Sequence, residues 1–232
     1  MSITTAKPRT KFFAGIAATA LLALPLAACG NNDDASTAAS SSSSSATASA
    51  PKPVASIDAL SGESTAITLD SGFTDALTAL KLTPGTVGDA TLADGALSFP
   101  ITGGNVTVFK PGTVSPYVIG QIQHVGSGLS LTAGDTEVEL TNLNVDPGVS
   151  RVYGDVSVNG KVAVQSAYLF TLDGRTLNPL ATEGDTAVLE GTQVKISPVA
   201  AELLNSTFNT DAVTADLLVG VAKITVNTTP AS

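Results

Sequence analysis

Residues 151–164 carry the clearest alternation of apolar and polar positions in the chain. In the first half every second residue is small or apolar, namely Val152, Gly154, Val156 and Val158. Asn159 and Gly160 follow, and another alternating run begins at Lys161. A period of two is typical of a half-buried strand, and Asn-Gly between two such runs favours a tight turn. We therefore expect an antiparallel hairpin here.

A further strand is expected at residues 136–140, where Glu137 and Glu139 share the polar face. The alternation slips at Thr141 and Asn142 before the apolar positions resume at Leu143. A slip of this kind indicates a β-bulge or a bend. The remaining strands are expected at 66–70, 95–101, 106–110, 118–124, 129–131, 168–172, 187–190, 193–196 and 217–226.

Two segments repeat their apolar residues with a helical period instead. In the segment 73–81 these residues are Phe73, Ala76, Leu77 and Leu80. In the segment 198–208 Ser197 is a good N-cap and Pro198 suits the first helical position. Both segments predict short helices.

Many short strands, frequent glycine turns and only two short helices favour a mainly β fold. Residues 56–229 are long enough to bury a core of their own. We expect them to form a single β-sandwich or barrel-like domain.

The first 28 residues have the organisation of a signal peptide. A basic stretch at residues 7–11 precedes an apolar run at residues 12–26, which is shorter than the roughly 20 residues of a transmembrane helix. The run ends in Leu26-Ala27-Ala28-Cys29, which resembles the lipobox of bacterial lipoproteins. The resemblance implies cleavage before Cys29, a diacylglycerol on its sulfur and a further acyl chain on the new amino terminus. These chains would hold the protein on the extracytoplasmic face of the cell membrane. An ordinary signal peptide and an uncleaved anchor are the alternatives.

Residues 29–55 are expected to form a disordered tether. Positions 35–50 contain only Ala, Ser and Thr, including six consecutive serines at 40–45. Such a composition cannot offset the entropy of ordering. A flexible coil of this length spans about 25–30 Å, enough to hold a domain away from a membrane.

Charge and composition exclude several classes of function. The 232-residue chain has 20 acidic and 11 basic residues, a formal charge of −9. Cleavage before Cys29 would remove three basic residues and no acidic ones, leaving 8 basic and 20 acidic residues, or −12. This balance argues against a nucleic-acid partner. With one cysteine and one histidine, the chain has no intrachain disulfide, and we expect no metal site.

No catalytic constellation stands out. The chain contains no G-x-S-x-G elbow and no glycine-rich phosphate loop before a helix. Its acidic residues occur singly on strand faces and in turns. We therefore assign no catalytic residue and expect a protein that is not an enzyme. The enzyme alternative is a hydrolase of wall polymers that uses a carboxylate pair.

The single histidine, His124, is the one candidate binding residue. It ends a segment that begins at Tyr117, and Val125-Gly126-Ser127-Gly128 follows. One interpretation is a half-exposed histidine at a strand end, and the other is a ligand contact, with a tyrosine as its partner. Tyr117 lies seven residues away and so falls on the opposite strand face. Only a bulge would bring these two side chains together.

Three stretches of the chain, 95–104, 122–131 and 136–145, resemble the pattern of actinobacterial envelope domains of the HtaA type. The shared pattern is a Phe-Pro pair, a gap, a histidine followed by glycine, and a strand with outward acids. The resemblance covers residues 73–226 and implies a surface-exposed, β-rich domain. In the iron-acquisition members it also implies haem binding through a tyrosine axial ligand with a nearby histidine.

His124 matches the histidine position of that family. The tyrosine of the family falls in the early amphipathic segment, where residues 73–80 contain no tyrosine. The chain therefore departs from the family pattern at the iron ligand.

Two functions remain beside the hydrolase. The first is a lipid-anchored extracytoplasmic envelope protein whose non-enzymatic β-domain binds or scaffolds an envelope component. The alternative is a carrier of a hydrophobic ligand, either haem or a lipid, with His124 as a contact. Haem would be a cofactor only in that alternative, and acyl chains on Cys29 provide the membrane contact in both.

Overall fold

Strands dominate the chain in the computed structural model, which describes residues 50–229. The strands are β1 (Pro53–Ile57), β2 (Glu63–Leu69), β3 (Thr83–Gly88), β4 (Thr91–Ala93), β5 (Ala96–Pro100), β6 (Gly103–Phe109), β7 (Val118–Ala133), β8 (Thr136–Asp146), β9 (Arg151–Val158), β10 (Lys161–Asp173), β11 (Ala181–Glu183), β12 (Thr186–Ile196) and β13 (Leu218–Asn227). The helices are α1 (Ser71–Ala79), α2 (Pro198–Phe208) and the short 3-10 helix η1 (Gly174–Thr176). The prediction of a mainly β domain with two short helices is confirmed.

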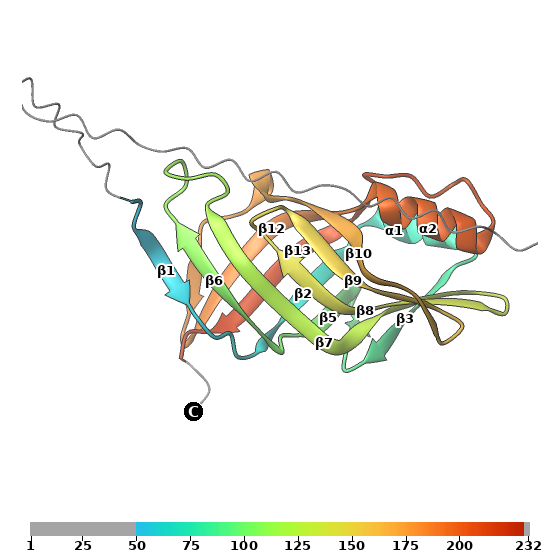
Figure 1. The fold of residues 1–232 in the computed structure, drawn as a ribbon, viewed down its shortest axis with the longest axis horizontal. Coiled ribbons are helices and arrows are strands. Elements are labelled where there is room, and N and C mark those ends of the chain that lie inside the picture. The colour runs from blue at the N-terminus through green and yellow to red at the C-terminus, as the bar shows by residue number, and fades with distance from the viewer. Residues whose placement is uncertain (1–49, 230–232) are drawn as a thin grey trace, which may run out of the picture. The chain divides into compact units, whose positions relative to one another are not determined.

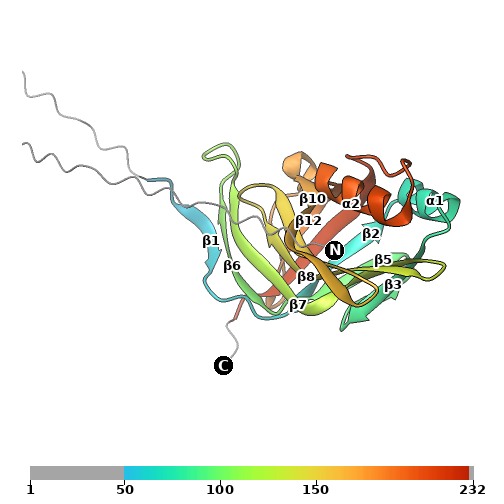
Figure 2. The same ribbon diagram turned by 45° about the vertical axis from the view of Figure 1, so that its right-hand side comes forward.

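The described strands form one antiparallel sheet. Its main path runs β1-β6-β7-β8-β9-β10-β12-β13-β2-β5-β4, with β11 beside β12 and β3 beside β7. The two ends of this path, β1 and β4, do not pair with each other, so the sheet is not a closed barrel. It curls until β2 and β5 face β7 and β8 (Figures 1 and 2). One continuous sheet therefore encloses the core, in place of two separate sheets.

A line of bulges crosses β7 to β10 and bends the sheet. Gly126, Asn142 and Ser166 each have a positive φ and interrupt the pairing of their strands. The Asn142 side chain accepts from the Gly126 N–H at 3.0 Å and donates to Asp155 at 2.9 Å. Asp155 also accepts from the Ser166 N–H at 2.9 Å, and these bonds lower the pKa of its carboxyl group. The predicted slip at Thr141 and Asn142 is thus a bulge, and bulges increase the local bend of a strand.

Both α-helices lie at the same end of the sheet (Figure 1). The helix α2 has its predicted bounds, because the Ser197 hydroxyl accepts from the Ala200 N–H at 3.0 Å and so caps the first turn. Helix α1 begins two residues before its predicted start. The reason is Asp70, whose carboxylate accepts from the Gly72 N–H at 2.8 Å.

The folded part begins earlier than the tether boundary at residue 55 would place it. Strand β1 starts at Pro53 and pairs with β6 through Ile57. Ala55 and Ile57 pack partly against the core, so backbone pairing at the sheet edge and these apolar contacts order the segment. Cys29 and residues 29–49 lie outside the described residues.

The described residues 50–229 belong to one compact unit. The buried apolar side chains of this unit extend from Leu60 to Val226 and form one cluster. We therefore expect residues 48–232 to fold on their own, and the experiments below use this segment.

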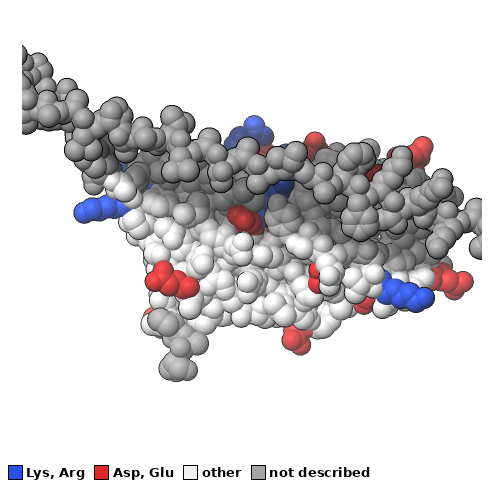
Figure 3. Space-filling view, viewed as in Figure 1, with Lys and Arg blue, Asp and Glu red and all other residues white. Residues whose placement is uncertain are grey.

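Charged side chains are few on the face shown in Figure 3, and broad uncharged surface separates them. Val138 and Leu140 are buried, so Glu137 and Glu139, which alternate with them along β8, point away from the core, as predicted. Among the described residues, no helix has the length and apolarity needed to cross a membrane.

Candidate ligand-binding cavity

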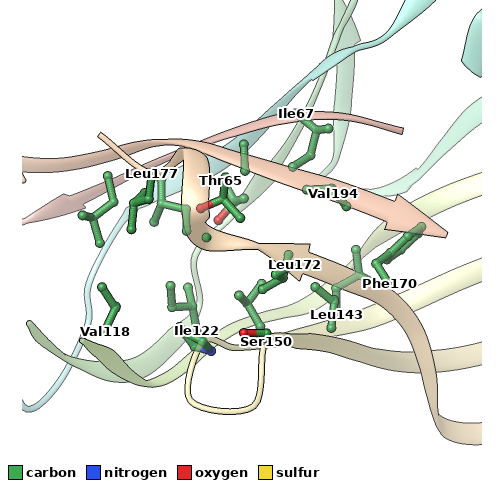
Figure 4. A pocket seen from close by; sticks show the side chains of 18 of the residues that line it. Thr65, Ile67, Val118, Ile122, Leu143, Ser150, Phe170, Leu172, Leu177 and Val194 are labelled. Carbon is green, nitrogen blue, oxygen red and sulfur yellow. The ribbon is translucent and has the colours of Figure 1, made fainter. Parts of the chain in front are cut away.

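A cavity of about 360 Å³ lies inside the curled sheet. Side chains of β2 and β12 converge on it from one side, and side chains of β7 and β8 from the other (Figure 4). Pockets for small ligands in proteins have volumes of about 300–1,000 Å³. The space is therefore large enough for a small ligand or one acyl chain.

The wall of the cavity is mostly aliphatic and aromatic. Its apolar side chains include Ile67, Phe99, Ile122, Leu129, Leu143, Val152, Phe170, Leu172, Val194, Val219 and Ile224. Its polar groups are Thr65, His124, Thr192, Ser115, Tyr117, Ser150 and Arg175. None of the described residues that line it is an aspartate or a glutamate. The cavity therefore does not supply the carboxylate pair on which a hydrolase of wall polymers would depend.

His124 occupies the deep part of the cavity and is only 1% exposed. Its Nδ1 lies 3.1 Å from the Leu143 carbonyl oxygen, and its Nε2 lies 2.8 Å from the Thr65 hydroxyl. The edge of the ring meets Phe99, with 6.2 Å between centroids. The two hydrogen bonds of His124 therefore connect β7 to β8 through Leu143 and to β2 through Thr65, across the interior of the sheet.

These two hydrogen bonds and the burial of the ring together define its tautomer and its charge state. A carbonyl oxygen can only accept, so Nδ1 carries the proton and Nε2 accepts from Thr65. Burial lowers the pKa of His124 to about 4, although the hydrogen bond to Leu143 opposes this shift. At neutral pH His124 is therefore an uncharged imidazole with both nitrogens bonded.

The mouth of the cavity lies where three chain reversals meet. These are the loop before β7, the β8–β9 turn and η1 after β10, which bring Ser115, Ser150 and Arg175 to the cavity. The strand register places them together, since Arg151 pairs with Asp146 on one side and with Thr171 on the other. Ser115 and Arg175 are exposed, so solvent reaches the cavity from this end.

Arg175 is held at the mouth by Asp173. Its Nε and one terminal nitrogen donate to the two carboxylate oxygens at 2.9 and 2.6 Å. Lys195 lies 3.3 Å from one of the same oxygens. The hydrogen bonds from Arg175 keep the pKa of Asp173 well below its usual range. Asp173 and Lys195 do not themselves line the cavity, so Arg175 is the one charged residue among the described residues that line it.

The structure contradicts one of the two interpretations of His124. His124 is fully buried in the middle of β7, which continues through both strands predicted at 118–124 and 129–131. The half-exposed strand end is therefore wrong. In the structure His124 shares one face of β7 with Val118 and Ile122, and both of these are buried.

Tyr117 lines the same cavity as His124 despite its opposite parity. It precedes the first residue of β7, so the alternation of that strand does not apply to it. The other two tyrosines are elsewhere. Tyr153 and Tyr168 pair across β9 and β10, on the face opposite to the cavity-lining Val152, and the Arg151 guanidinium lies 4.5 Å from the centre of the Tyr168 ring.

Sequence reasoning missed Thr65 and Arg175. Thr65 comes 59 positions before His124, and only the curl of the sheet brings the two together. Arg175 follows a predicted strand, and nothing in the local pattern indicates that η1 turns it towards the cavity mouth. Within residues 50–229, no cluster of three or more His, Cys, Asp or Glu side chains is arranged to hold a metal ion.

His124 is not available as an iron ligand at this site, which leaves Tyr117 as the tyrosine among the described residues that line the cavity. An iron ligand needs a free lone pair, and the Nε2 lone pair of His124 already accepts from Thr65. The family position for the tyrosine falls on α1, where Phe73 and Leu77 are the buried residues. Residues 73–80, which contain no tyrosine, therefore contribute core side chains in the fold and do not supply the family's iron ligand.

Comparison with solved structures finds similar structures from an actinobacterium. The C-terminal domain of HtaA from Corynebacterium glutamicum is 12% identical with a TM-score of 0.50, over 74% of this chain and 98% of that domain. A domain-swapped dimer of a variant of that domain is 12% identical with a TM-score of 0.44, over 68% and 90% of the two chains. The heme binding protein HtaB of the same organism is 9% identical with a TM-score of 0.42, over 75% and 96%.

At 12% identity, the likeness to the HtaA domain shows a shared fold. The β-rich architecture that the resemblance implied is thereby confirmed. No protein-family model and no curated protein matches the chain.

Proposed function

We propose that residues 50–229 form a non-enzymatic binding domain that holds an apolar ligand of the lipid class in the interior cavity. The observation that carries this proposal is a preformed space of about 360 Å³ with an apolar wall and no acidic lining residue among the described residues. An empty apolar cavity loses the packing of its lining atoms, and a ligand restores it. The alternative of the hydrophobic carrier is thus favoured over a plain scaffold.

A lipid agrees with the polar groups of the cavity better than haem does. The two deep polar side chains, Thr65 and His124, satisfy each other and need no ligand atom. An acyl chain needs only apolar contacts at the deep end of the cavity. The similarity to HtaA supports a binding role at the level of fold, and the heme binding described for HtaB stays with that protein.

The test is to purify residues 48–232, extract the protein with organic solvent and analyse the extract by mass spectrometry. Titration with a fluorescent fatty acid then measures saturable binding. We expect a bound acyl species, or one saturable site of micromolar affinity. An empty extract together with no saturable binding contradicts the proposal.

Haem is the second ligand to titrate in the same experiment. A Soret band that shifts on binding and is lost in Tyr117→Phe would assign the cavity to haem. We expect no such band, because His124 offers no free nitrogen.

We propose further that Cys29 carries the acyl chains that hold this domain on the extracytoplasmic face of the cell membrane. The supporting observation is the lipobox-like Leu26-Ala27-Ala28-Cys29 after a basic and then an apolar stretch. Cys29→Ala should abolish labelling by a palmitate analogue and release the protein from the membrane fraction. A variant that stays membrane-bound would instead indicate an uncleaved anchor.

A further inference from the structure

We infer that the ligand is an amphiphile with an anionic head group, such as a carboxylate, and that Arg175 holds this head at the cavity mouth while the chain lies in the interior. This inference rests on the proposed function and names the chemical class of its ligand. It follows from the distribution of charge along the cavity.

The charge of the cavity wall is opposite to that of the chain. The chain has 20 acidic and 11 basic residues, yet the only formally charged side chain among the described lining residues is Arg175. His124 at the deep end is uncharged, because burial lowers its pKa to about 4. An anionic head would therefore meet attraction at one place only.

Arg175 has donors to spare. Its side chain is 87% exposed, and the hydrogen bonds to Asp173 use two of its five N–H groups. Asp173 itself is mostly buried, at 12% exposed, and receives Lys195 from the other side. The carboxylate thus fixes the orientation of the guanidinium, and the remaining donors stay available to a ligand.

Neutral donors stand beside the guanidinium at the same rim. Ser115 and Ser150 line the mouth from the loop before β7 and from the β8–β9 turn. Their hydroxyls can donate to a carboxylate but also to a neutral head group. The preference for an anion therefore depends on Arg175, which makes this residue the one to vary.

The deep end suits a chain terminus and not a head group. Thr65 and His124 are hydrogen-bonded to each other, the Phe99 ring meets His124, and Leu129 and Ile67 add apolar side chains to the cavity wall. A carboxylate placed there would lose its hydration without gaining a free donor. The head must therefore lie at the mouth, which fixes the direction in which the ligand enters.

The test compares laurate with lauryl alcohol, two ligands of equal chain length, on residues 48–232 at pH 8 and low salt. The dissociation constant of each is measured by displacement of a fluorescent fatty acid. We expect laurate to bind about 3–10-fold more tightly, the range for one charge-assisted hydrogen bond near solvent. Added salt should reduce this preference.

Arg175→Gln should remove the preference while leaving the affinity for lauryl alcohol unchanged. The matched control is Lys161→Gln. Lys161 is a cation at the tip of the β9–β10 hairpin, outside the cavity, and this variant should keep the preference for laurate. Circular dichroism confirms that each variant is folded.

The outcomes separate the two proposals. Equal binding of laurate and the alcohol, or a preference that persists in Arg175→Gln, overturns the anionic head and leaves the apolar cavity intact. Failure of both ligands to bind overturns the proposed function as well.

Discussion

The two ends of the cavity hold polar groups under opposite conditions. At the deep end, His124 and Thr65 are 1% and 4% exposed, and the hydrogen bonds between them and to Leu143 stay within the protein. At the mouth, Arg175 is 87% exposed and keeps donors free. Buried polar groups whose donors and acceptors are all used stabilise the fold. Exposed donors that a neighbouring side chain holds in place are suited to binding a ligand. We therefore assign stability to the deep end and ligand selection to the mouth.

The largest expected effect is the loss of the deep contact. His124→Ala leaves the Leu143 carbonyl and the Thr65 hydroxyl without partners and opens a hole beside Phe99. We expect the free energy of unfolding to fall by about 3 kcal/mol, measured by denaturant titration. Thr65→Val, which keeps the shape and removes one hydrogen bond, should cost about 1–2 kcal/mol. A loss below about 1 kcal/mol in His124→Ala would remove the contrast between the two ends.

The second prediction concerns pH. The pKa of His124 is about 4 in the folded state and near 6.5 in the unfolded state, so folding favours the neutral ring. The contribution is fully present above pH 6.5 and is lost as the pH falls towards 4. Between pH 7 and pH 5 we expect a loss of about 2 kcal/mol.

The matched control for this pH effect is His124→Gln, which cannot titrate and should lack the loss. Because the chain has one histidine, its ring C–H resonance in proton spectra reports the same group directly. A midpoint near pH 6.5 in the folded protein would contradict the buried neutral ring.

The third prediction fills the cavity without touching either end. Ala222 lines the cavity from β13 and is buried. Ala222→Leu should weaken acyl-chain binding about 10-fold, because the added methyl groups occupy the volume of the chain. Ala163→Leu, on an exposed stretch of β10 outside the cavity, adds the same groups and should leave binding unchanged. Equal effects of the two variants would place the ligand elsewhere.

The smallest effect is expected at Asp173. Asp173→Asn removes the negative charge beside Arg175 and Lys195 but keeps an acceptor oxygen that can orient Arg175. Since Arg175 is mostly exposed, solvent screens its pairing with Asp173 and stability should change little. The affinity for laurate should rise about 2–3-fold as the mouth gains positive charge, while the affinity for lauryl alcohol stays constant. A large loss of stability would show that the mouth is structural, like the deep end.

Local patterns predicted much of the sheet. The Asn159–Gly160 hairpin, the bulge at Asn142 and the Ser197 cap all depend on neighbouring residues, and all three are found. Strand β3 was missed because it contains Pro84 and Gly85, which look like a turn. It forms because it pairs with β7 at a sheet edge. Backbone pairing of this kind does not require apolar and polar residues to alternate along the edge strand.

The site was less predictable than the strands. His124 was identified because it is the only histidine, and its burial follows once β7 is known to continue through Gly126. Thr65 and Arg175 reach the cavity through the curl of the sheet and through η1, which are set by bulges and pairings far away in the chain. Only the three-dimensional structure joins these groups into one site.

The most direct test of the central claim is a methyl-labelled sample of residues 48–232 titrated with laurate and followed by NMR. We predict that the methyl resonances of Leu129 and Val194, which line the cavity, shift with one common saturation curve. The exposed methyl groups of Val54 and Val162 should stay in place. Shifts confined to the exposed methyl groups, or no saturable shift at all, would contradict an acyl chain bound inside the sheet.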